Sequence, residues 1–376
     1  MSGPVPETTV PETTAPETTA PESTAPEAAV PEAGALGPAL GADAAASVAP
    51  VPDADCEVAD LTIAYRAEGT WLRAVRDLSF EVRPGETLAV VGETGSGKSS
   101  AALAIMRLLP AAGRVDTGSV RVRGLDMLSL SDRELRQVRG KLIGYVPQQP
   151  SAAFNPVMTI GRQVAEALVT HEGVRYKEAL TTVTQTLTEM GLEDPAGLVR
   201  SYPHQLSGGM LQRAMIASAI IARPRLLLTD EPTSALDVGI QRQILNLLKR
   251  VRDDHGLTIV LITHDLGAVS QIADRVLVLY AGRKVEIGPA RVLLTAPRHP
   301  YTRGLLTSYP AAGLAHKSRL AALPGAPLGP AEVDAEQGCP FRTRCSRVQE
   351  VCASEFPAAS GDAVHAWHCH NPEPAP

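Results

Sequence analysis

The chain has 376 residues and a formal net charge of −6, and hydrophobic residues make up 44% of it. Residues 1–55 hold nine Asp and Glu and no Lys or Arg, which leaves 35 basic and 32 acidic side chains in the rest. This nearly neutral remainder argues against a protein that follows the phosphates of a nucleic acid. No apolar run approaches 18 residues and no basic-then-apolar leader is present, so we expect neither a membrane span nor a secretory signal.

Residues 5–34 are six copies of one pentamer, from VPETT to VPEAG. Proline at every fifth position opposes helices and sheet pairing, and the repeat offers no apolar cluster to bury. We therefore expect residues 1–55 to form a disordered acidic tail. It is either a docking or spacer segment or a solvated tail without a role.

From Cys56 onward, short apolar runs separated by turns predict a folded α/β region. Strands are expected over residues 58–65, 74–82, 87–91, 119–123, 141–146, 225–230, 258–263 and 275–280. Helices are expected over 99–109 and 238–254, and residues 158–222 have mostly helical periodicity. Strands that alternate with helices predict a parallel sheet covered on both faces, here with a helical insert in its middle.

A glycine-rich stretch between a predicted strand and a predicted helix fits the pattern G-x-x-x-x-G-K-[ST]. It consists of Gly92, Glu93, Thr94, Gly95, Ser96, Gly97, Lys98 and Ser99, and Ser100 follows. Its backbone N–H groups and the helix N-terminus are suited to phosphate oxygens. Lys98 is expected to reach the β- and γ-phosphates, and the Ser99 hydroxyl to bind Mg²⁺. The alternative is a glycine-rich turn without a ligand.

A second candidate site lies where the apolar run from Leu226 ends in Asp230 and Glu231. Ligands of open α/β sheets bind at the carboxyl ends of the strands. We expect Asp230 to hold Mg²⁺, through water, and Glu231 to act as the general base for an attacking water. The alternative is a strand end that simply meets solvent.

Residues 206–213 read Leu-Ser-Gly-Gly-Met-Leu-Gln-Arg. This stretch resembles the LSGGQ signature of ATP-binding-cassette (ABC) ATPases, with Met210 where Gln is commoner. Ser207 and the N–H groups of Gly208 and Gly209 are expected to form another phosphate cradle. In that family the signature completes the ATP site of the opposing subunit; the alternative is an ordinary helix N-cap.

The resemblance places the remaining ABC elements. Gln148 resembles the glutamine that touches Mg²⁺ and senses the γ-phosphate, Asp237 ends a segment like the D-loop at the dimer interface, and His264 resembles the switch histidine at the γ-phosphate. Tyr65 is placed to stack on adenine, or it is a core residue. The resemblance implies an ABC-type P-loop fold over residues 56–290, with a RecA-like core, an antiparallel β subdomain and a helical subdomain at about 150–222.

Three further stretches resemble the oligopeptide/dipeptide importer group, which includes some nickel importers. They are residues 153–163, 299–306 and 324–327. The resemblance implies that residues 291–376 are an importer-type extension. It implies an ATPase subunit at the cytoplasmic face of the membrane, with a second cassette, two permease subunits and an extracytoplasmic solute-binding protein. The rival reading is a soluble ABC ATPase that acts on nucleic acid or ribosomes.

The extension ends in four cysteines, Cys339, Cys345, Cys352 and Cys369, with spacing C-x5-C-x6-C-x16-C. Four thiolates suit a 4Fe–4S cluster or Zn²⁺, and members of the importer group can carry such a cluster there. We expect the cluster, with zinc and unligated thiols as the alternatives.

Overall fold

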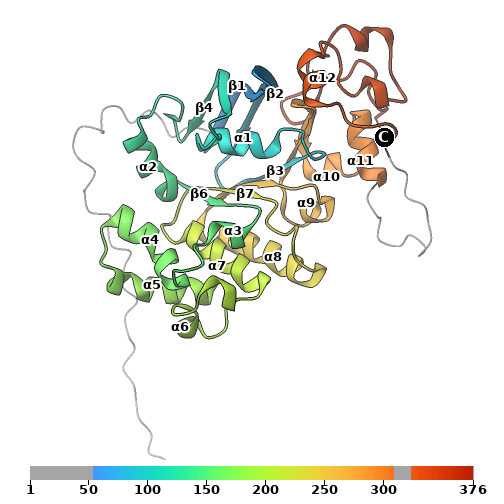
Figure 1. Cartoon of the computed structure of the whole chain (residues 1–376). Helices are drawn as coiled ribbons and strands as arrows, with labels where there is room; N and C mark the ends of the chain where they lie inside the picture. The colour runs from blue at the N-terminus through green and yellow to red at the C-terminus, as the bar shows by residue number, and fades with distance from the viewer. Residues whose placement is uncertain (1–53, 309–322, 376) are drawn as a thin grey trace, which may run out of the picture. The chain divides into compact units, whose positions relative to one another are not determined.

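The computed structural model describes residues 54–308 and 323–375 (Figure 1). The predicted tail lies outside the described residues except for its last two positions. Of these, Asp55 is buried, its carboxylate 2.8 Å from Arg123 Nη1 and 2.5 Å from the donating Thr258 hydroxyl. Asp55 therefore belongs to the folded region, and the predicted boundary at residue 55 lies too far along the chain.

A four-stranded antiparallel sheet has the strand order β2-β1-β4-β5. Its strands are β1 Cys56–Ala67, β2 Thr70–Val82, β4 Gly113–Val122 and β5 Leu125–Asp126. The hairpin between β1 and β2 turns at Glu68 and Gly69, whose φ angles of 50° and 82° are those that a tight two-residue turn requires. This sheet is the expected antiparallel β subdomain.

The second sheet has eight strands in the order β11-β12-β10-β9-β3-β8-β7-β6. Five are parallel: β6 Ile143–Val146, β7 Leu226–Asp230, β8 Thr258–Ile262, β3 Thr87–Val91 and β9 Arg275–Tyr280. Every residue of β3, β7 and β8 is buried, which explains their nearly continuous apolar sequences. The expected parallel sheet is confirmed for these five strands, whereas the other three pair antiparallel.

Helices cover the main sheet and form the insert between β6 and β7. The insert contains α3 Pro150–Ala153, α4 Ile160–Glu172, α5 Tyr176–Glu189, α6 Pro195–Leu198 and α7 Gly208–Ile220. In α4 the buried side chains of Ile160, Val164 and Leu168 recur every fourth residue, so one face of the helix packs into the insert's core. Outside the insert lie α1 Lys98–Ile105, α2 Asp132–Lys141, α8 Val238–His255, α9 Leu266–Ile272 and α10 Ala290–Leu293.

The C-terminal extension continues the main sheet. Its elements are α11 Pro300–Ser308, α12 Pro330–Ala335, β11 Ser360–Gly361 and β12 Ala366–Trp367, and β12 pairs with β10 Arg283–Pro289. Buried Glu286 of β10 accepts hydrogen bonds from the backbone N–H groups of Arg298 and His299 and contacts His365 Nε2 at 2.8 Å. Among residues 54–308 and 323–375, no helix is long and apolar enough to cross a membrane.

Candidate nucleotide-binding site

The phosphate loop connects β3 to α1, and two of its glycines, Gly92 and Gly97, have no room for a side chain. A Cβ atom on Gly92 would lie 2.2 Å from the carbonyl oxygen of Leu279, and Gly97, with φ of 98°, caps the start of α1. Lys98 is buried, and its Nζ donates to the carbonyl oxygens of Gly92 and Glu93 at 2.8 and 2.9 Å. The carbonyl oxygens of the loop thus hold the Lys98 side chain in position at the N-terminus of α1.

Three loops meet at one edge because β3, β7 and β8 are parallel neighbours. Glu231, directly after β7, lies in the left-handed region with φ of 47°, a strained conformation typical of functional sites. Its carboxylate accepts from Gln148 Nε2 at 3.3 Å and contacts His264 Nδ1 at 2.8 Å. The structure therefore brings these three predicted residues together.

Asp230 and Ser99 fit a divalent cation. Asp230 is buried, and burial raises its pKa, while a hydrogen bond from Ser99 lowers it. Asp230 Oδ1 is buried without a hydrogen-bond partner among the described residues. An orphaned carboxylate oxygen beside a hydroxyl is an oxygen donor set that Mg²⁺ favours. Burial also lowers the pKa of Lys98, which the nearby carboxylates of Glu231, Asp230 and Glu93 counteract.

Lys98, Ser99 and Glu231 line a cavity of about 570 Å³. Of the predicted nucleotide-binding residues, the cavity is lined by Gly92, Glu93, Thr94, Gly95, Gly97, Lys98, Ser99, Ser100, Gln148, Glu231 and His264. Asp230 is not among the lining residues, but it is hydrogen-bonded to Ser99, which is. One cavity thus unites residues from four separate stretches of sequence.

Tyr65 and Ser96 line a neighbouring cavity. The hydroxyl of Tyr65 donates to Ser100 Oγ at 2.9 Å, and its ring lies against Gly113, where an added Cβ would be 2.7 Å away. Tyr65 is therefore bonded to the first turn of α1, next to the phosphate loop, and it is partly buried against a core cluster.

The signature residues do not line the phosphate cavity. Ser207 caps α7 by accepting from the Met210 N–H, and Asp237 caps α8 by accepting from the Ile240 N–H. Ser207, Gly208 and Asp237 are exposed, and Gly209 is half-buried. Their role at an interface with a second subunit stays a prediction.

Two residues of the extension contact the phosphate loop, which we did not anticipate. The hydroxyl of buried Tyr301 accepts from the Glu93 N–H at 2.8 Å, and Arg344 Nη1 and Nη2 contact the Glu93 carboxylate at 2.7 and 3.0 Å. Tyr301 lies within the 299–306 stretch that the sequence analysis singled out, so a signal existed for it. For Arg344 the sequence signal is only that it directly precedes Cys345.

The four cysteines of the extension gather in one region. The pKa of Cys339 is raised to about 12, mainly by burial and in smaller part by the thiols of Cys352, Cys369 and Cys345, which indicates that the four lie near one another. Nevertheless, in the part of the chain that the structure describes, no group of three or more His, Cys, Asp and Glu is arranged to hold a metal ion. The predicted 4Fe–4S cluster, or zinc, therefore finds no support here.

Comparisons with protein families give two matches. Residues 75–234 match the model of the ABC transporter family, and residues 285–352 match the oligopeptide/dipeptide transporter C-terminal region. Among solved structures, a dimeric ATP-binding cassette in a post-hydrolysis state, bound to ADP and Pi, is 28% identical with a TM-score of 0.57; the match covers 63% of this chain and 99% of that one. The cbiO1 structure from Clostridium perfringens, at 24% identity and a TM-score of 0.55, shares the fold over 65% of this chain and 97% of its own.

Curated relatives match over a longer stretch. A Brucella ovis protein named "Putative peptide import ATP-binding protein" is 43% identical over 325 residues, which cover 83% of this chain and 96% of that protein. The oligopeptide transport ATP-binding protein OppD of Mycobacterium tuberculosis is 46% identical over 302 residues, covering 80% of this chain and 49% of OppD. This chain belongs to the ABC transporter ATP-binding proteins that carry the oligopeptide/dipeptide transporter C-terminal region.

Proposed function

We propose that this chain is the ATP-hydrolysing subunit that powers a bacterial ABC importer for peptides or a similar small solute. The observation that carries the proposal is one cavity that unites the phosphate loop, Gln148, Glu231 and His264 in a chain with an importer-type extension. The extension and the relatives named as peptide import proteins favour this reading over a soluble ABC ATPase acting on nucleic acid or ribosomes.

The residues of the cavity divide the work of phosphoryl transfer. Lys98 and the N–H groups of the loop bind the phosphate oxygens. Ser99, Asp230 and Gln148 hold Mg²⁺, which when bound supplies positive charge to the β- and γ-phosphates. Phosphoryl transfer depends mainly on such positioning and charge stabilisation.

Glu231 is the general base. Its carboxylate takes a proton from the attacking water, and its contacts with Gln148 and His264 fix the orientation of that carboxylate. His264 is 61% exposed and lines the cavity, and its role is to contact the γ-phosphate. These roles are supported by the distances between the three side chains and by the chemistry of their functional groups.

A second cassette completes each ATP site. The exposed Ser207, with the N–H groups of Gly208 and Gly209 at the start of α7, supplies a phosphate cradle to the opposing subunit, and Asp237 lies at the interface. The working complex at the cytoplasmic face of the membrane then holds two cassettes, two permease subunits and, outside the cell, a solute-binding protein.

We also propose, on the sequence pattern alone, that Cys339, Cys345, Cys352 and Cys369 bind a thiolate-ligated metal centre, a 4Fe–4S cluster with Zn²⁺ as the alternative, although the described side chains are not arranged as a metal site. Iron, zinc and acid-labile sulfide are measured after anaerobic purification, together with the visible absorbance. A colourless protein free of both metals contradicts this assignment and leaves the ATPase proposal unaffected.

The test of the proposed function is purification of the tagged full chain from detergent-solubilised native membranes, followed by mass spectrometry of its partners. Recovery of two multi-span permeases, with ATP hydrolysis by the recovered complex, is the expected result. Recovery only with ribosomal or nucleic-acid-associated proteins contradicts the importer reading.

A further inference from the structure

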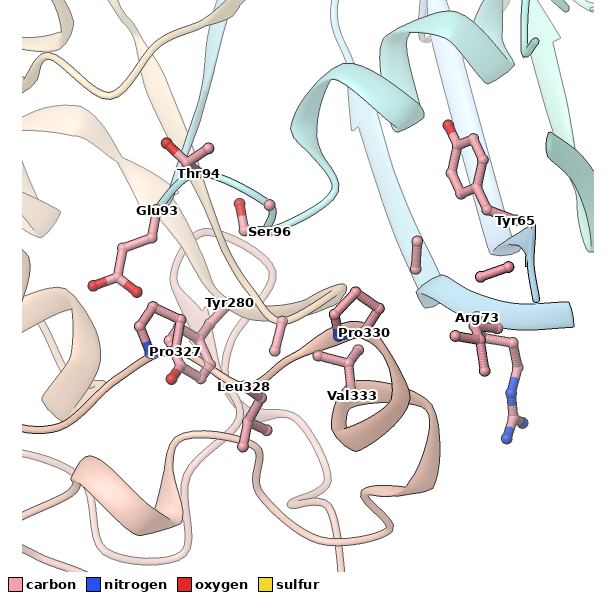
Figure 2. Close-up of a pocket in the computed structure, with 15 residues that line it drawn as sticks. Tyr65, Arg73, Glu93, Thr94, Ser96, Tyr280, Pro327, Leu328, Pro330 and Val333 are labelled. Atoms are coloured by element: carbon pink, nitrogen blue, oxygen red, sulfur yellow. The ribbon is translucent and has the colours of Figure 1, made fainter. Parts of the chain in front are cut away.

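A second cavity of about 370 Å³ adjoins the phosphate cavity. The two cavities share four lining residues, which are Ala74 and the loop residues Glu93, Thr94 and Gly95. A ligand whose phosphates lie on the loop can therefore occupy both cavities. Figure 2 shows the second cavity between the phosphate loop and the extension.

The walls of this second cavity come from opposite ends of the chain. On one side lies Tyr65, at the β1–β2 hairpin, and on the other lie Pro327, Leu328 and Val333 of the extension (Figure 2). The lining is mainly apolar, and the volume falls within the range of about 300–1,000 Å³ that is typical of small-molecule sites. Such a site suits a flat, weakly polar group.

Both ends of the extension segment that forms the wall are fastened to the cassette. At its start, Arg344 Nε donates to the carbonyl oxygen of Pro324 at 2.8 Å while its other nitrogens contact Glu93. At its end, Asp334 pairs with Arg73 of β2 at 2.7 Å. The 327–333 segment is therefore held through Arg344 to the phosphate loop and through Asp334 to strand β2.

We propose that the extension completes the nucleotide site: the base and sugar of a nucleotide bound at the phosphate loop lie between Tyr65 and the 327–333 segment. This inference rests on the proposed function and adds a binding role for the extension. An aromatic ring and an apolar wall on either side of a base contribute contact energy that does not depend on the phosphates. The segment is thus a determinant of affinity for the nucleoside part of the ligand.

The test measures equilibrium binding of Mg²⁺-ATP and of Mg²⁺-tripolyphosphate, which lacks a base, to the full chain. Leu328→Ala removes three carbon atoms; with about one of them in contact with the base, ATP binding is expected to weaken by about fourfold, and tripolyphosphate affinity is expected to stay unchanged. Leu328→Trp, which places a bulky indole at the cavity wall, is expected to weaken ATP binding by about tenfold or more with tripolyphosphate again unchanged. Val348→Ala, at a side chain 51% exposed elsewhere on the extension, is the control.

Two results overturn the inference. One is an equal loss of affinity for both ligands, which reports a general structural defect. The other is unchanged ATP affinity in both Leu328 variants. Failure of the proposed function itself is distinguishable, because it shows as absence of ATP binding or hydrolysis in the unmodified protein.

Discussion

Arg344 and Glu93 are 251 positions apart, and their side chains form a two-point ion pair with N–O distances of 2.7 and 3.0 Å. The side chain of Arg344 is only 4% exposed, and that of Glu93 24%. The pair raises the pKa of Arg344, since the hydrogen bond to Glu93 outweighs the effect of burial. It connects the residue next to Cys345 with the second residue of the phosphate loop.

Removal of Arg344 is expected to destabilise the protein. Arg344→Met leaves the partly buried Glu93 carboxylate without its partner, at a cost of about 1–3 kcal/mol in the free energy of unfolding. Denaturant unfolding of Arg344→Met, Glu93→Gln and the double variant measures the coupling between them. Arg83→Met, in an exposed pair with Glu81 at 3.6 Å, is the control and is expected to cost at most about 0.5 kcal/mol. Fully additive single effects contradict a direct pair.

Glu231→Gln is expected to bind ATP and to hydrolyse it slowly. The amide keeps the shape of the side chain but cannot take a proton from water, so turnover falls by about 10²-fold or more. ATP binding and phosphate release are measured in the assembled complex, with Glu189→Gln, at a side chain 54% exposed on α5, as the control. Near-normal turnover of Glu231→Gln would show that another group acts as the general base.

Asp230→Asn is expected to remove the Mg²⁺ dependence of ATP binding. The buried, unpartnered Oδ1 of Asp230 needs a cation or a proton, and an amide at this position offers the cation no charge. Affinity for ATP is measured with Mg²⁺ and with EDTA. The unmodified protein is expected to bind ATP more tightly with Mg²⁺ than with EDTA, whereas the variant binds ATP equally in the two conditions. A variant whose ATP affinity still rises with Mg²⁺ argues against Asp230 as a Mg²⁺ ligand.

His299 is expected to make the fold sensitive to mild acid. Burial lowers the pKa of His299 to about 4, an effect that nearby Glu286 partly offsets and nearby His368 reinforces. Its ordinary pKa in the unfolded chain is about 6.5. Between these values the unfolded chain binds a proton that the folded chain does not, so stability falls as the pH drops from about 6.5 to about 4.

The size of this acid effect is up to about 3 kcal/mol. Burial alone would raise the pKa of Glu286, but its hydrogen bonds, above all that with His365, lower it. Protonation of Glu286 at still lower pH therefore reduces the stability of the fold further. In His299→Asn the amide oxygen replaces Nδ1 as acceptor for the Tyr301 N–H. Melting temperatures of both proteins from pH 7.5 to 4.5 should show a shallower slope for the variant; identical slopes assign the acid sensitivity to other groups.

The central strands were predictable because their signals are local. Residues 87–91 and 275–280 were expected as strands and form β3 and β9 with the same bounds. Each is a run of apolar residues bounded by turn or loop residues, and burial on both faces selects such runs. β10 was missed because its sequence, RKVEIGP, has no uniform apolar pattern, and its Glu286 is buried only because the extension supplies its partners.

Local sequence alone determined the phosphate loop, the carboxylates after β7 and the family, because the spacing of glycines, lysine and acids within short segments dictates what their backbone can bind. The tertiary structure decided how Glu231 meets Gln148 and His264, and how the extension reaches the loop. Contacts between residues more than 200 positions apart, such as Arg344 with Glu93, arise only when whole elements pack. No local pattern encodes such contacts, since the partners are chosen by the sheet order and the packing of the extension against it.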